Sequence, residues 1–139
     1  MKYSASMHNA EGKLDVVMKV GDRVNTLEIS PKPKGFGSSI SGGEVLFLAI
    51  ATCYTNDIYR EARRQGIVVD AVEVDIDGDF MGAGMSAENV TCRIKVTAQT
   101  CESEIRKLVE HTDLIAEIPM SLRRGISITL AEIETKSSL

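Results

Sequence analysis

Apolar and polar residues alternate near the start of the chain and so predict β-strands. The alternation covers residues 2–8, 14–20 and 24–29, and short glycine-containing turns separate the three stretches. A period of two is typical of strands with one buried face, and a short glycine turn joins antiparallel neighbours. The pattern predicts a three-stranded meander.

A loop and a long helix follow the meander. Residues 30–40 hold two prolines and two glycines, which favour a loop. Ser41 and Glu44 have the S-x-x-E spacing of a capping box, which predicts a helix start. No proline interrupts the sequence before Gly66, and a glycine commonly ends a helix. We expect this helix to be the longest element.

The two halves of this helix differ in composition. Residues 45–51 are apolar on every face, whereas residues 56–65 carry seven charged or amide side chains. A helix that is apolar all round must be covered on all sides, and a small domain offers its sheet on one side only. We expect a second copy of the chain to supply the remaining cover.

Charge alternates along two further predicted strands. Apolar residues alternate with Glu and Asp over residues 72–80, and with Arg, Lys and Thr over residues 90–98. An acidic strand face beside a basic one favours antiparallel pairing of the two.

The end of the chain predicts a second helix and a last strand. The helix is expected from about Cys101, and Pro119 and Gly125 are expected to break the chain before a strand at residues 126–133. The expected order is βββ-α-ββ-α-β, an α+β fold in a single domain, residues 1–139.

Composition narrows the classes of function. The chain has 139 residues, a net charge of -4 and 43% apolar residues, which suits one soluble domain. The lack of a basic cluster argues against nucleic acid, and the lack of a signal segment or long apolar run argues against a membrane and for the cytoplasm. Three irregularly spaced cysteines and two histidines give no zinc or disulfide pattern, so we expect no metal and no cofactor.

Cys53 lies where the apolar half of the long helix meets the polar half. It shares a helical face with Asp57 and Arg60. A buried cysteine is most often a small apolar residue, and Asp57 disfavours a thiolate, whereas Arg60 favours one. The residues alone leave open whether Cys53 reacts or packs, and whether Glu44 is a cap or a functional carboxylate.

Two other positions are weaker candidates. Cys101 is expected in the first turn of the second helix, where the helix N-terminus favours a thiolate. His111 lies close to Asp113 near that helix's end, where a histidine commonly meets the last carbonyls. The acidic run at residues 75–79 is more typical of a solvated strand face than of a calcium loop.

The stretch SGGEVLFLAIATCYTNDIYREARRQGIVVDAVEVDIDGDF, residues 41–80, resembles the central segment of the OsmC/Ohr superfamily. There a pattern of the type P-x-E-L-L-L-A-A-L-A-S-C opens a long helix, which ends in a basic, glycine-terminated stretch before a V-x-V-x-V strand. The order of the flanking elements agrees over nearly the whole chain. The resemblance implies an OsmC-like fold with a long central helix, in which two chains intertwine as a homodimer. It also implies thiol-dependent reduction of organic hydroperoxides by two cysteines, an arginine and a glutamate.

Only some of the functional residues that the resemblance implies are present in this chain. It matches Cys53 to the peroxide-attacking cysteine and Glu44 to the acidic residue that many members have nine positions earlier. The second cysteine of the family falls on residues 116–118, which are Ala-Glu-Ile here. The arginine of the first hairpin would fall on residues 8–12, which contain none, and Arg23 is the nearest candidate.

Two functions therefore stay open, and with them the question of whether the protein is an enzyme. One is a divergent thiol-dependent hydroperoxide reductase of oxidative-stress defence, recycled by an external thiol or by Cys101. The other is a non-catalytic OsmC-fold protein that binds a small apolar or acyl ligand at the dimer interface. The candidate site consists of Cys53 and Glu44 as catalytic residues, with Asp57, Arg60, His111 and Cys101 in support.

Overall fold

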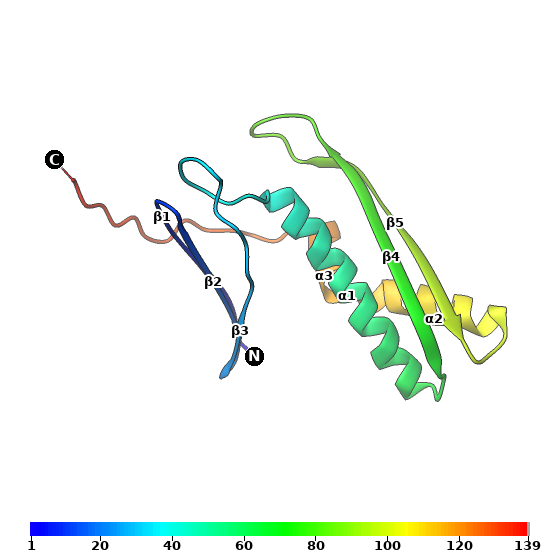
Figure 1. Ribbon diagram of the computed structural model, residues 1–139. Helices are drawn as coiled ribbons and strands as arrows, with labels where there is room; N and C mark the ends of the chain where they lie inside the picture. The colour runs from blue at the N-terminus through cyan, green and yellow to red at the C-terminus, as the bar shows by residue number, and fades with distance from the viewer. Residues whose placement is uncertain (139) are drawn as a thin grey trace. The chain divides into compact units, whose positions relative to one another are not determined.

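The computed structural model describes residues 1–138 and confirms a mixed α+β fold with three helices and two antiparallel sheets (Figure 1). The chain forms two compact units, Met1–Phe47 and a second that begins at Leu48. The prediction of a single domain over residues 1–139 stays a prediction. Within the described residues, no helix is both long and apolar enough to cross a membrane.

The first unit contains the predicted meander. Its strands are β1 (Tyr3–Ala10), β2 (Lys13–Val20) and β3 (Arg23–Thr26), and β2 pairs antiparallel with both neighbours. Gly12 and Gly21 occupy the two turns with φ of 67° and 57°, a left-handed conformation that glycine adopts at little cost. The prediction of three sequential strands is confirmed.

Helix α1 (Gly42–Arg64) begins and ends where the sequence predicts. The Ser41 N–H donates to Glu44 Oε2 at 2.6 Å, and the Glu44 N–H donates to Ser41 Oγ at 3.2 Å, which completes the capping box. At the other end Gly66 has a φ of 70°, and the Ile67 N–H donates to the Ala62 carbonyl at 2.9 Å. This bond is the one that a glycine-ended helix makes to satisfy its last carbonyls.

Strands β4 (Val69–Phe80) and β5 (Ala87–Ala98) form an antiparallel hairpin in the second unit, as predicted. Their register places apolar residues opposite apolar ones and acidic residues opposite basic ones: Val72 and Val96, Val74 and Ile94, Glu73 and Lys95, Asp75 and Arg93. Pairs of this kind stabilise a ladder on both faces.

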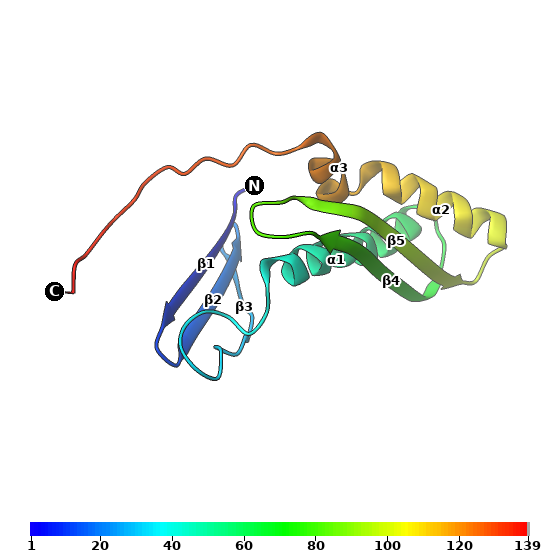
Figure 2. The same ribbon diagram turned by 90° about the horizontal axis from the view of Figure 1, so that it is seen from above.

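The core of the second unit lies between the hairpin and two helices. Ile58 and Ala62 of α1 and Leu108 of α2 (Glu102–Ile115) form its buried centre. Partly buried residues of the hairpin and of the turn before it pack around them: Ile67, Val69, Val72, Ile94 and Val96. Figure 2 shows the two helices beside the β4–β5 hairpin.

A third helix corrects the prediction that Pro119 breaks the chain. Pro119 lies in the first turn of α3 (Glu117–Arg124), where a helix needs no bond from its N–H. In a continuous helix its ring would clash with the carbonyl of Ile115, four residues earlier, and α2 ends at that residue. Ala116, fully buried, caps the end of α2 and the start of α3. The sequence predicted no helix at this position, so α3 is an element that the prediction missed.

The predicted last strand is wrong for the single chain. Residues 126–133 form no strand, and the apolar side chains that suggested one, among them Ile128 and Leu130, are exposed. The alternation is that of a strand, but a strand needs a neighbour for its backbone hydrogen bonds. Neither of the two sheets in residues 1–138 pairs with this segment.

Candidate functional site

Cys53 lies half-buried on α1 with its sulfur facing two carboxyl groups. Its Sγ donates to Oδ2 of Asp57, one helical turn further on, at 3.3 Å. Its Sγ also lies 3.9 Å from Oε2 of Glu117, the first residue of α3. The start of α3 is therefore brought against the middle of α1 at this thiol.

Arg60 connects the carboxylates around the thiol. Its Nη1 donates to Oδ1 of Asp57 at 2.7 Å, and its Nε donates to Oε1 of Glu61 at 2.9 Å. Nη1 also lies 3.7 Å from Oε1 of Glu117. One oxygen each of Asp57 and Glu117 thus faces the guanidinium, while the other faces the sulfur of Cys53.

Opposing effects act on the pKa of Cys53. Burial is the largest and raises the pKa of this thiol to about 11. The backbone N–H of Ile118, in the first turn of α3, acts the other way, because a donor at a helix N-terminus stabilises a thiolate. The nearby charges of Asp57 and Glu117 raise the pKa further. The resting group at neutral pH is therefore a thiol.

The three carboxyl groups differ in their pKa. Burial raises the pKa of Asp57, whose residue is only 4% exposed, and the neighbouring Glu117 adds to this. The hydrogen bond from Arg60 lowers the pKa of Glu61, and a hydrogen bond from its own backbone N–H lowers the pKa of Glu117. Burial therefore favours the protonated form of Asp57, whereas the surroundings of Glu61 and Glu117 favour their charged forms.

A family profile described as OsmC-like protein matches residues 35–131, which is more than half of the chain and includes the cluster around Cys53. The chain belongs to the OsmC-like protein family. No curated protein sequence matches it significantly.

Solved OsmC-like structures share the fold of this chain. The OsmC-like protein of Mycoplasma pneumoniae has a TM-score of 0.63 at 16% identity, over 88% of each chain. A putative osmotic stress induced and detoxification response protein of Psychrobacter arcticus 273-4 has a TM-score of 0.61 at 15% identity, over 84% of this chain and 85% of its own. An OsmC-like hydroperoxide resistance protein of Jannaschia sp. CCS1 has a TM-score of 0.54 at 15% identity, over 91% of this chain and 88% of its own.

The structure brings together some of the predicted site residues of this OsmC-like chain. Asp57 and Arg60 lie with Cys53, as described above. His111 joins the group indirectly, because its Nε2 lies 3.4 Å from Oε2 of Glu61. Sequence reasoning thus placed four members of one connected cluster, without Glu61, the carboxylate that links His111 to the others.

Two predicted residues lie apart from the thiol. The carboxylate of Glu44 serves the capping box, and in a continuous helix the nine positions to Cys53 are two and a half turns, which leads to the opposite face. Cys101 occupies the N-cap position of α2 without a capping hydrogen bond from its side chain, and its Sγ lies 3.2 Å from Ser103 Oγ. That hydrogen bond lowers the pKa of the exposed Cys101 thiol.

Sequence reasoning missed Glu117 and Glu61 as members of the site. A signal for Glu61 was present, because residues 53, 57 and 61 are spaced four apart and share one face of a helix. Glu117 lies within residues 116–118, the stretch that the resemblance aligns with the second cysteine. The side chain that approaches Cys53 from this stretch is therefore a carboxylate and not a thiol.

A second polar network, also missed, fastens the three helices together. The Tyr54 hydroxyl of α1 donates to Oδ1 of Asp113 of α2 at 2.6 Å, and Arg123 Nη2 of α3 donates to the same oxygen at 2.8 Å. These two bonds lower the pKa of Asp113, the Tyr54 bond most strongly, while burial raises the pKa of Tyr54. The network holds α3 near α1 at Tyr54, the residue that follows Cys53 in the sequence.

Three side chains of the cluster have the spacing of metal ligands. One donor atom each of Cys53, Asp57 and Glu117 lies within 4.8 Å of the others. A thiolate and two carboxylates are a donor set that Zn²⁺ accepts. The guanidinium of Arg60 already brings a positive charge to both carboxylates, so the geometry does not require a metal ion.

Proposed function

We propose that this OsmC-like protein reduces organic hydroperoxides with Cys53 as the reacting thiol and an external thiol as the reductant. The observation that carries the proposal is the contact of a half-buried sulfur with charged groups that Arg60 holds, at the N-terminus of α3. Family membership supports it, as does a similar fold named as a hydroperoxide resistance protein.

The surroundings of Cys53 favour a cycle with a single reacting cysteine. Attack on a hydroperoxide converts a cysteine to a sulfenic acid, which a thiol must then reduce. Glu117 occupies the position facing the sulfur, and a carboxylate forms no disulfide. Cys101 lies at the far end of α2, whose 14 residues span about 21 Å at 1.5 Å per residue. A disulfide needs Cα atoms about 4.4 to 6.8 Å apart, so Cys101 is too distant to resolve Cys53 within one chain, and we propose an external thiol for this step.

We further propose that the working form is a homodimer. Val45 and Leu48, in the apolar first half of α1, are exposed in the single chain, and Leu48 exposes 56% of its surface. The alternating apolar residues of 126–133 are also exposed and lack a strand partner. A second copy would cover these exposed apolar side chains.

Consumption of cumene hydroperoxide tests the proposed activity. With dithiothreitol as reductant, wild-type protein should consume it faster than hydrogen peroxide, because the proposed substrate is an organic hydroperoxide. Cys53→Ser should abolish consumption, and the matched control Cys101→Ser should retain it. Equal rates for wild type and Cys53→Ser would reject the proposal.

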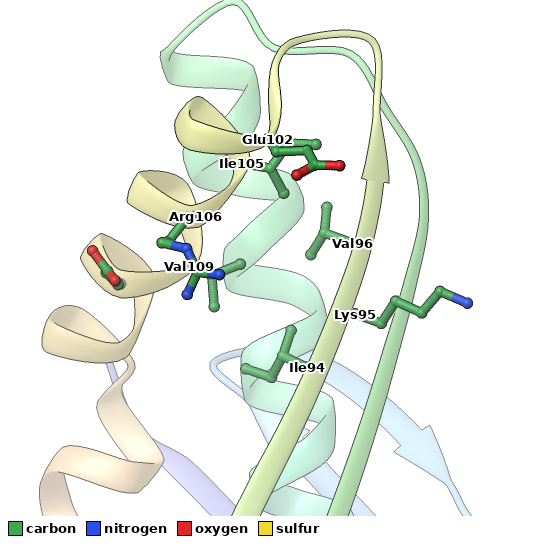
Figure 3. Close-up of a pocket in the computed structure, with 8 residues that line it drawn as sticks. Ile94, Lys95, Val96, Glu102, Ile105, Arg106 and Val109 are labelled. Carbon is green, nitrogen blue, oxygen red and sulfur yellow. The ribbon is translucent and has the colours of Figure 1, made fainter.

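A second candidate function is binding of a small apolar or acyl ligand without catalysis. The pKa of Cys53 of about 11 favours it, because a protonated thiol is a poor nucleophile. A groove of about 390 Å³ between α2 and β5 offers a place within the second unit (Figure 3). Four apolar side chains line it together with two basic and two acidic ones: Ile94, Val96, Ile105, Val109, Lys95, Arg106, Glu102 and Glu110.

Binding of a fluorescent fatty acid distinguishes the second candidate from the first. If the groove binds the ligand, Val109→Asp should abolish the fluorescence change, while Cys53→Ser should retain it. No fluorescence change with wild-type protein would remove the candidate.

A further inference from the structure

The contact between Cys53 and Asp57 raises a chemical question that the proposed function leaves open. A thiol with a pKa of about 11 is ionised in roughly one molecule in ten thousand at pH 7. The thiolate is the nucleophile in attack on a peroxide. The alkoxide that leaves also needs a proton, since it is a strong base. The reaction therefore gains if one group accepts the thiol proton and returns it to the departing oxygen.

Asp57 is placed to do both. Its Oδ2 accepts the hydrogen bond of the Cys53 thiol at 3.3 Å, which is within the reach of a general base. Its other oxygen is held by Arg60 at 2.7 Å, and the two residues lie on adjacent turns of one helix. The carboxyl group is thus fixed by an ion pair on one side and directed at the sulfur on the other.

The neighbouring carboxylates fit the role less well. Glu117 is further from the sulfur, at 3.9 Å, and its side chain is 65% exposed. Glu61 has both oxygens in use, since Arg60 and Arg64 donate to Oε1 and His111 lies against Oε2. Burial also raises the pKa of Asp57, whereas the pKa of each of the other two carboxyl groups is lowered.

We propose that Asp57 is a catalytic residue that carries the proton of Cys53 to the leaving oxygen, an inference that rests on the proposed function. As the sulfur bonds to the distal oxygen of ROOH, the O–O bond breaks and its electron pair stays on RO. Oδ2 of Asp57 takes the thiol proton and delivers it to RO, which leaves as the alcohol ROH. The sulfur is oxidised by two electrons to Cys53–SOH, the peroxide is reduced by two, and Asp57 ends as the carboxylate.

Two rates measured on Asp57→Asn separate this role from a purely electrostatic one. Loss of the negative charge makes the thiolate easier to form. The rate at which iodoacetamide alkylates Cys53 at pH 7, measured by peptide mapping, should therefore rise or stay level. In this reaction the leaving group, iodide, needs no proton, whereas the alkoxide that leaves a hydroperoxide needs one. The rate of cumene hydroperoxide reduction at pH 7 should therefore fall by about 100-fold, the smaller end of what general acid and base catalysis contributes.

Glu117→Gln is the matched control, because it removes one negative charge near the same sulfur. Both rates of this variant should change in the same direction. If Asp57→Asn instead reduces cumene hydroperoxide as fast as wild type or faster, Asp57 only opposes ionisation and the inference is wrong. If wild type shows no Cys53-dependent consumption, the proposed function fails and the inference fails with it.

Arg60→Lys provides a second variant should Asp57→Asn not fold. It keeps the positive charge but loses the guanidinium fork, which bonds Asp57 through Nη1 and Glu61 through Nε and so fixes the orientation of Asp57. Hydroperoxide reduction should fall by a larger factor than alkylation of Cys53. Equal changes in the two rates would overturn the inference.

Discussion

Burial along α1 does not simply follow the composition of its two halves. The first half, residues 45–51, is apolar, yet Val45 and Leu48 are exposed in the single chain. The second half carries the charges, yet Asp57 and Glu61 are only 4% and 3% exposed. Burial depends on the partners available and not on hydrophobicity alone. Buried carboxylates persist because Arg60 pairs with both, whereas an apolar surface needs a cover.

Cys53 lies between these two halves, which defines its chemistry. One turn further on, the ion pairs of the second half begin, and on the other side lies the surface that we assign to a second chain. The following predictions test this contrast, from the largest expected effect to the smallest.

Leu48→Asp should disrupt the protein most. If a second copy covers residue 48, the substitution buries an unpaired charge and should prevent assembly and folding together. Light scattering and circular dichroism measure the two outcomes. Val68→Asp is the matched control, because Val68 is also 56% exposed, and its stability should stay within about 0.5 kcal/mol of wild type. A Leu48→Asp protein as stable as the control would contradict a covered first half.

Ile58→Ala tests the second half, whose core lies within one chain. Ile58 is 0% exposed, so loss of its side chain should leave a cavity and lower the free energy of unfolding by about 2 to 5 kcal/mol. Urea unfolding measures the change, and Ile58→Val should cost about 1 kcal/mol. A cost below that of Ile58→Val would show that the site relaxes to fill the space.

Glu61→Gln should have a smaller effect, and that effect should depend on pH. The pKa of Glu61 is lowered in the folded state by Arg60, so the carboxylate stabilises the fold above its unfolded pKa of about 4.3. The contribution is lost as the pH falls through the lower folded value. Urea unfolding should show Glu61→Gln less stable than wild type at pH 7, with the difference shrinking as the pH falls below about 4.3. A stability difference between wild type and Glu61→Gln that does not depend on pH would mean that the change in side-chain packing, and not the charge, causes it.

Local signals explain how much of the fold could be predicted. The capping box of Ser41 and Glu44 and the glycine at position 66 set both ends of α1 through bonds between near neighbours. The alternating charges of β4 and β5 set their pairing. By contrast, the strand predicted at residues 126–133 depends on a neighbour that no local pattern supplies.

The candidate site could be predicted only along one helix. Spacing on α1 placed Asp57 and Arg60 with Cys53, because residues three or four apart share a face. Glu117 lies 64 positions from Cys53 in the sequence. It approaches the sulfur because the chain turns between α2 and α3, where Pro119 prevents a continuous helix. Pattern showed the proline as a break and could not show which side chain the new helix would direct at the thiol.

Intact mass after treatment with tert-butyl hydroperoxide, without added thiol, tests the central claim that Cys53 reacts without a resolving cysteine. Wild-type protein should gain about 16 Da and then about 32 Da, assigned to Cys53 by peptide mapping, as a sulfenic and then a sulfinic acid. Added dithiol should suppress the second step, and Cys101→Ser should behave as wild type. A loss of about 2 Da from a disulfide between Cys53 and Cys101, or an unmodified Cys53 after excess peroxide, would contradict the account.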